Sequence, residues 1–161
     1  MAKPSVQQNQ RLAQLKQDVL VQMESMGHWS QESLSPLQNI PLAVLRKNAT
    51  QRHGVTRFRR GARTTELKTK DVETIDLHPN LLSMEWNDYA QFVLYHEYLH
   101  ALGNRFHDTA FHQLEQLWPF PGSERGREFT QLMRQKSATW LWVCTTCDKK
   151  YPRKRKANRR F

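Results

Sequence analysis

The chain has 161 residues, which is enough for one domain with a short appendage and too few for a multidomain enzyme. Its 38% hydrophobic residues, with five Trp and seven Phe, exclude a disordered polymer. No run approaches the roughly 18 to 20 apolar residues of a membrane helix, and the N-terminal segment lacks the apolar core of a secretory signal. We therefore expect a cytoplasmic protein that is not secreted and has no membrane partner.

The net charge of +10 is concentrated in two acid-free stretches. Residues 33–65 hold seven basic residues: Arg46, Lys47, Arg52, Arg57, Arg59, Arg60 and Arg63. The C-terminal residues 149–161 hold eight more: Lys149, Lys150, Arg153, Lys154, Arg155, Lys156, Arg159 and Arg160. Such segregation is typical of a surface that binds a polyanion, and a solvated tail is the alternative. We expect these eight tail residues to bind DNA through its phosphates, without sequence specificity, and the protein to be associated with DNA or the nucleoid.

The first half of the chain predicts one helix followed by a small sheet. Residues 5–26 place apolar side chains at three- and four-residue steps and end at Gly27, which indicates an amphipathic helix. The apolar run 41–45 fits either a short helix or a buried strand. The alternation over 54–60 and the β-prone run 72–77 predict two strands.

The second half predicts helices and one further strand. The strongest helical segment spans about 88–102, begins at Asn87 or Asp88 as N-cap and is closed by Gly103. Beyond it the pattern predicts a helix over 108–118, a loop over 122–126, a weak helix over 127–136 and a strand over 139–143.

The strongest helix contains the sequence His96-Glu97-Tyr98-Leu99-His100. Four residues advance a helix by about 400°, so both imidazoles project from nearly the same face and can bind one Zn²⁺. The candidates for a third ligand are His107 and His112, of which His107 is favoured because Gly103 lets the chain turn back toward the helix. Glu97 is then placed to take a proton from a water molecule at the metal. A structural zinc or a chance match of the motif is the alternative.

From Gly54 to Tyr151 the sequence resembles the SprT/Spartan-like metalloprotease family. The resemblance lies in the segment around Thr56-Arg57-Phe58, in Thr74 to Leu81, in the helix with His96 to Ala101, and in His107 to Phe111. It implies an α+β fold of the small zincin-like, minigluzincin type, in which a few-stranded sheet packs on the H-E-x-x-H helix with flanking helices. It also implies Zn²⁺ bound by His96, His100 and His107, with Glu97 as the catalytic base.

The C-terminal part resembles the first half of the family's zinc ribbon, from Trp140 to Tyr151. A ribbon needs four ligands, whereas the chain has only Cys144 and Cys147. This pair is a possible second metal site, with the ribbon truncated after its first half. Distant histidines such as His28 or His53 as further ligands, or simply free thiols, are the alternatives.

Together the H-E-x-x-H motif and the basic segments predict a zinc-dependent metalloprotease that hydrolyses peptide bonds in proteins near DNA, and the resemblance implies that it processes DNA–protein crosslinks. The expected division is an N-terminal helix over 1–27, the protease domain over 28–138, and a partial ribbon with basic tail over 139–161. The alternatives are a nucleic-acid-binding protein with a structural or vestigial zinc site, and a zincin-fold peptidase that acts without DNA. The sequence makes no prediction of the oligomeric state.

Overall fold

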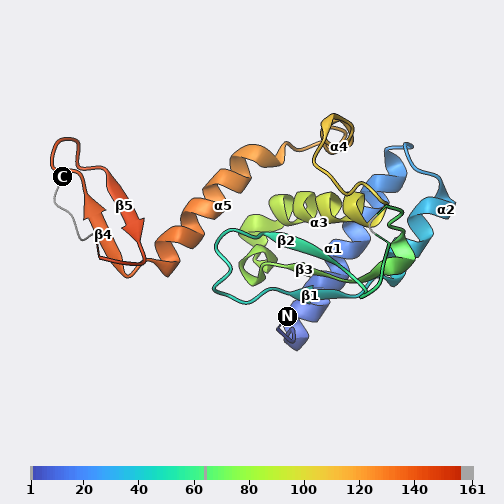
Figure 1. Ribbon diagram of the computed structural model, residues 1–161, viewed down its shortest axis with the longest axis horizontal. Coiled ribbons are helices and arrows are strands. Elements are labelled where there is room, and N and C mark those ends of the chain that lie inside the picture. Colours follow the sequence, from blue (N-terminus) through green and yellow to red (C-terminus); the bar gives the residue numbers. More distant parts are fainter. Residues whose placement is uncertain (1, 64, 157–161) are drawn as a thin grey trace. The chain divides into compact units, whose positions relative to one another are not determined.

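The computed structural model describes residues 2–63 and 65–156 (Figure 1). The chain divides into two compact units, residues 1–122 and 123–161, here named unit 1 and unit 2. The protein is mixed α+β with a small sheet and several helices, so the predicted α+β class is confirmed. Within the described ranges, every helix is too short or too polar to span a bilayer.

Unit 1 contains a three-stranded sheet with β3 (Val72–Leu77) in its centre. Strand β1 (Leu42–Val44) pairs parallel to β3, and β2 (Gly54–Phe58) pairs antiparallel to its other side. The apolar run 41–45 therefore forms a strand and not a helix. It is buried at Ala43 and Val44, as expected of a short strand covered by the rest of the unit. Strand β2 lies at the edge of the sheet.

The described residues of unit 1 include four α-helices and four 3₁₀ helices. The α-helices are α1 (Val6–Ser25), α2 (Gln31–Leu34), α3 (Asn87–Ala101) and α4 (Thr109–Glu115), and the 3₁₀ helices are η1 (Ser35–Asn39), η2 (Thr69–Asp71), η3 (Pro79–Leu82) and η4 (Met84–Trp86). Helices α1 and α3 pack on the sheet and on each other (Figure 1). Helix α1 begins with a capping box, in which Ser5 Oγ accepts the Gln8 N–H and Gln8 Oε1 accepts the Ser5 N–H.

Helix α3 carries much of the core, because Leu94, Tyr95, Tyr98 and Leu99 are fully buried. It matches the predicted helix to within one residue at each end, but its predicted N-cap is wrong. Trp86 occupies the N-cap position without a side-chain hydrogen bond to the helix. The Asn87 side-chain oxygen instead accepts a hydrogen bond from Arg11 of α1, and the Asp88 carboxylate accepts the adjacent Tyr89 N–H.

Unit 2 consists of most of α5 (Gly122–Ser137) and the antiparallel hairpin of β4 (Trp140–Val143) and β5 (Lys150–Arg153). The predicted loop 122–126 is wrong, since these residues form the first turn of α5, where Glu124 lies favourably at the positive end of the helix dipole. Strand β5 was not predicted from the sequence. Its Pro152 argues against a strand, yet proline is tolerated in an edge strand.

The division into units differs from the division expected from the sequence. Helix α1 is part of unit 1, because Leu12, Leu15 and Val19 are buried in its core. The boundary between the units lies at residues 122 and 123, not at 138 and 139, so α5 groups with the hairpin. Helical periodicity shows that a helix has an apolar face but not which body covers that face.

Unit 1 also holds a half-buried and a fully buried histidine, His53 and His78, away from the H-E-x-x-H segment. His53 Nδ1 lies 2.6 Å from the Tyr89 hydroxyl, and the His53 carbonyl accepts the N–H of the fully buried His78 at 2.8 Å. Burial, together with the nearby His78, lowers the pKa of His53 to about 4. The folded protein therefore favours a neutral imidazole at position 53.

Replacing His53 with Asn is expected to reduce the acid sensitivity of the fold. The contribution of His53 to stability is present above pH 6.5, where the unfolded chain is also neutral at this residue, and it is lost as the pH falls toward 4. In urea titrations of metal-free protein between these pH values, the wild type should lose roughly 1 to 2 kcal/mol more unfolding free energy than H53N. The exposed His28→Asn is the control, and equal losses in wild type and H53N would contradict the prediction.

Candidate metal centre and basic surface

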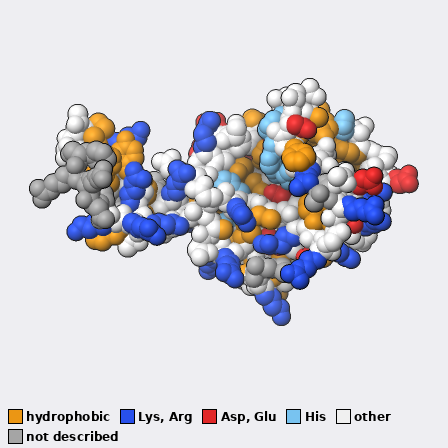
Figure 2. Space-filling model, in the orientation of Figure 1, with side chains coloured by type: hydrophobic (Ala, Val, Ile, Leu, Met, Phe, Trp, Pro, Cys, Tyr) orange, Lys and Arg blue, Asp and Glu red, His pale blue; other side chains and the backbone are white. Residues whose placement is uncertain are grey.

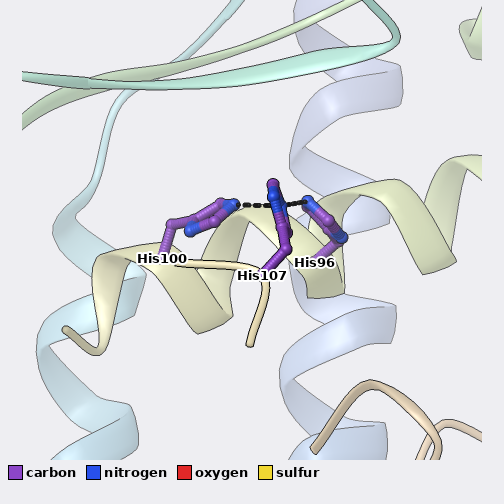
Figure 3. A group of neighbouring side chains, drawn as sticks. All are labelled: His96, His100 and His107. Atoms are coloured by element: carbon purple, nitrogen blue, oxygen red, sulfur yellow. Dashed lines mark hydrogen bonds between the residues drawn. The ribbon is translucent and has the colours of Figure 1, made fainter. Parts of the chain in front are cut away.

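Three histidines converge at the surface of unit 1. His96 and His100 lie one turn apart on α3, and His107 lies on the loop between α3 and α4. The Nε2 atom of His107 is 3.1 Å from the Nε2 atoms of both His96 and His100 (Figure 3). One nitrogen of each of the three rings lies within 4.8 Å of the others, which is close enough to bind a metal ion.

The turn after α3 brings His107 back to the helix. Gly103 adopts φ of +104°, a left-handed conformation that glycine tolerates best, and its N–H bonds to the His100 carbonyl at 3.0 Å. The Asn104 backbone N–H and side-chain amide both donate to the Leu99 carbonyl, which fixes the start of the loop. The expectation that Gly103 lets the chain return toward the helix is confirmed.

The outer nitrogens of the two helical histidines are held by other groups. His96 Nδ1 donates to Glu115 Oε1 at 2.7 Å, and His100 Nδ1 donates to the Asn104 carbonyl at 2.7 Å. A proton held on Nδ1 leaves Nε2 as the atom with a free lone pair, so both rings present an acceptor to the centre. Glu115 was not singled out by the sequence analysis, because it lies 19 residues from His96 and belongs to no local motif.

His112 does not join the cluster. It is exposed on α4, and its Nδ1 atom lies 3.3 Å from the second oxygen of Glu115. Of the two candidates for a third ligand, the structure places His107 next to His96 and His100 and leaves His112 outside the group.

Phe111 forms an apolar floor beneath the three imidazoles. It is fully buried at the start of α4, and its ring centroid lies 4.8 to 4.9 Å from those of His96, His100 and His107. Burial lowers the pKa of His100 to about 4 and also lowers the pKa of His107. Neutral imidazoles are the form that binds metal, so the surroundings of these rings favour coordination over protonation.

Glu97 is directed toward β2 from the same helix. Its side chain is 5% exposed, and Oε2 accepts a hydrogen bond of 2.8 Å from the Thr56 hydroxyl. Burial raises the pKa of Glu97, and this effect is opposed by the neighbouring His96 and by the Thr56 hydrogen bonds. A carboxyl with a raised pKa is a suitable proton carrier near neutral pH.

A basic groove of about 590 Å³ lies within unit 2. Its cationic side chains come from α5 (Arg127 and Arg134) and from the hairpin (Lys149 and Lys150), and Tyr151 also lines it. Figure 2 shows Lys and Arg gathered on this unit beside hydrophobic side chains. The sequence analysis missed the two arginines of α5, although their spacing of seven residues places both on one face of a helix.

The other predicted DNA-binding residues lie in or after β5. Arg153 ends β5, and the exposed Lys154, Arg155 and Lys156 follow it. Arg159 and Arg160 lie outside the described residues. In the other basic stretch, Arg57 of β2 forms an ion pair of 2.6 Å with the fully buried Asp76 of β3, and so links two strands of the sheet. The remaining six basic residues of this stretch are exposed.

The hairpin exposes aromatic side chains next to cations. Trp140 is 48% and Trp142 is 38% exposed, and the Trp142 ring contacts the Tyr151 ring of the opposite strand. The Lys156 ammonium lies 5.6 Å from the Trp140 ring centroid, and the Lys149 ammonium lies 5.7 Å from that of Tyr151. The hairpin therefore offers flat π-surfaces among positive charges.

Cys144 and Cys147 lie in the turn between β4 and β5 as free thiols. Hydrogen bonds from the Thr146 and Cys147 backbone N–H groups lower the pKa of the Cys144 thiol. In the described part of unit 2, no third potential ligand completes a metal-binding group with them. His28 and His53, the other ligands considered, belong to unit 1.

Comparisons with protein-family models, curated proteins and solved structures find no match to this chain.

We expect removal of His107, but not of His112, to abolish tight metal binding. His107→Ala deletes one of three converging nitrogens, whereas His112→Ala deletes a ring outside the cluster. In titrations with Zn²⁺, the wild type should bind one ion per chain at this site, with a Kd at least about 100-fold lower than that of H107A. Equal loss of affinity in H112A would contradict the assignment. All three proteins should carry Cys144→Ser and Cys147→Ser, so that thiols do not contribute.

Proposed function

We propose that the protein is a zinc-dependent metalloprotease of the SprT/Spartan-like type, with a zincin-like fold, that hydrolyses peptide bonds in proteins bound to DNA. The observation that carries this proposal is the set of three Nε2 atoms that converge beside α3, with the Glu97 carboxylate on the same helix. Helix α3 packs along the edge strand β2, and this arrangement supports the zincin-like fold.

The donor set fits zinc. Three imidazoles are a ligand set typical of catalytic zinc, which keeps one further position for water or substrate. Zn–N distances of about 2.0 to 2.1 Å in a tetrahedron place neighbouring nitrogens about 3.3 Å apart. The two distances of 3.1 Å between Nε2 atoms lie close to this value. No fourth ligand joins the group among the described residues, as an open site requires.

Zinc bound by His96, His100 and His107 would supply Lewis-acid chemistry, which lowers the pKa of water and polarises a peptide carbonyl. Glu97 accepts a proton from the attacking water as the water oxygen bonds to the carbonyl carbon. The same carboxyl then gives the proton to the amide nitrogen as the C–N bond breaks. Glu115 and the Asn104 carbonyl keep the His96 and His100 rings oriented throughout.

The charge of unit 2 supports DNA as the partner. Its sequence has 12 basic and 3 acidic residues, whereas unit 1 has 13 basic and 12 acidic residues. The groove of unit 2 and the exposed Lys154, Arg155 and Lys156 offer contacts to phosphates, which carry no base code. Exposed Trp140 and Trp142 suit unpaired bases, since aromatic rings stack on every base.

Glu97→Gln is expected to abolish proteolysis without removing zinc. Gln keeps the shape of the side chain but cannot accept the proton, so cleavage of a DNA-binding protein should fall by at least about 100-fold. The assay follows cleavage of that substrate and of the chain itself, with and without single-stranded DNA, while zinc content is measured in parallel.

Three outcomes separate the candidate functions. Cleavage that needs DNA and disappears in E97Q supports the proposal. Cleavage that is equal without DNA favours a peptidase that acts without DNA, because every residue of the metal site lies in unit 1. A zinc-loaded wild type that binds DNA but cleaves nothing would contradict proteolysis and favour a DNA-binding protein with a structural metal.

Binding to DNA should weaken steeply with salt and depend on the groove of unit 2. Each phosphate contact contributes about 0.7 to 0.9 to the slope of log K against log salt concentration. We therefore expect the double variant R127Q/R134Q to lower affinity equally for unrelated sequences and to reduce this slope by about 1.5 in fluorescence anisotropy. Lys3→Gln, at an exposed site in unit 1 outside both basic stretches, is the control. An unchanged slope in the double variant would exclude the groove.

A further inference from the structure

Strand β2 lies against the Glu97 side chain. Thr56 Oγ1 lies 2.8 Å from Glu97 Oε2 and 3.0 Å from the Glu97 backbone carbonyl oxygen. A Cβ atom at Gly54 would come within 2.7 Å of Glu97 Oε1. Gly54 and Thr56 are two residues apart in the strand, so they share the face of β2 that meets α3.

The Thr56 hydroxyl fixes one of the two carboxylate oxygens. A glutamate has several rotatable bonds and adopts many rotamers unless a contact selects one of them. Threonine is β-branched and therefore stiff at χ1, and its hydroxyl proton is shared between the side chain and the backbone of Glu97. Oε2 is thus engaged by the Thr56 hydroxyl.

Gly54 provides the space in which the carboxylate lies. The missing Cβ would be 2.7 Å from Oε1, 2.9 Å from Glu97 Cγ and 2.8 Å from Val93 Cγ1. Any larger residue at position 54 would displace the Glu97 side chain or move α3 away from β2. The φ angle of Gly54 is not positive, so its backbone conformation does not require glycine. The close approach of α3 requires it.

We propose that Thr56 is a positioning residue, whose hydroxyl holds Glu97 through Oε2 in the orientation from which the carboxylate accepts the proton of the attacking water. The inference rests on the proposed proteolytic function and adds the residue that orients its base. It also gives a role to both residues, Gly54 and Thr56, on the face of β2 that meets α3.

The test compares three variants with matched chemistry. Thr56→Val removes the hydroxyl and keeps the shape, Thr56→Ser keeps the hydroxyl, and Thr69→Val is the control. Thr69 Oγ1 also donates to a backbone oxygen of α3, that of Ala101 at 3.2 Å, but it does not touch Glu97. We expect T56V to lower kcat about 10- to 100-fold, with KM within about twofold and zinc content unchanged. T56S should recover most of this loss, and T69V should cleave as the wild type does.

A second measurement does not depend on activity. Thermal unfolding of metal-free wild type, T56V, E97A and the double variant forms a double-mutant cycle. If Thr56 holds Glu97, the melting temperature of the double variant should fall by less than the sum of the decreases in the two single variants, because each single variant removes the same bond.

The outcomes separate this inference from the proposed function. Additive losses in melting temperature, or T56V that cleaves as fast as the wild type, would overturn the positioning role of Thr56. T56S as impaired as T56V would also overturn it, since the hydroxyl would then not be the cause. A zinc-loaded wild type that cleaves no protein, combined with non-additive losses, would overturn the proteolytic function but not the placement of Glu97 by Thr56.

Discussion

The packing of α3 against the sheet is the constraint on which the rest of unit 1 depends. The helix buries Leu94 and Leu99 in the core and at the same time carries His96, Glu97 and His100. Because consecutive residues of a helix are separated by about 100°, Glu97 turns toward β2 when the two histidines face the surface. One helix register therefore fixes the core, the metal ligands and the base, and rotating α3 to improve one of them would displace the others.

The parts of the fold that follow local patterns were predictable. Strand β3, helix α1 and helix α3 lie where hydrophobic spacing placed them, and the spacing of His96 and His100 predicted a shared helical face. The clustering of His107 with this pair followed from one further local feature, a glycine at the end of the helix.

Features that depend on distant partners were not predictable. Asn87 and Asp88 have good capping side chains. The Asn87 side chain, however, accepts a hydrogen bond from Arg11, and the Asp88 carboxylate accepts the N–H of the adjacent Tyr89, so Trp86 takes the N-cap position. Glu115 and Thr56 reach the site from other elements of unit 1, and nothing in the residues next to either one marks this role. Glycines at both ends of residues 122–126 indicated a loop, yet this segment forms the first turn of α5.

The position of the third histidine on a loop has a consequence for the stability of unit 1. His96 and His100 belong to one helix, whereas His107 lies on the loop between the turn at Gly103 and the capped start of α4. A metal shared by all three rings would act as a cross-link that closes this loop onto α3. The free energy of unfolding then depends on the metal concentration. An ion that binds only the folded state adds about 2.7 kcal/mol to it at a free concentration of 100 times Kd. Chelation would therefore release the segment between α3 and α4 from this cross-link, and the supply of metal would set the fraction of chains that are folded.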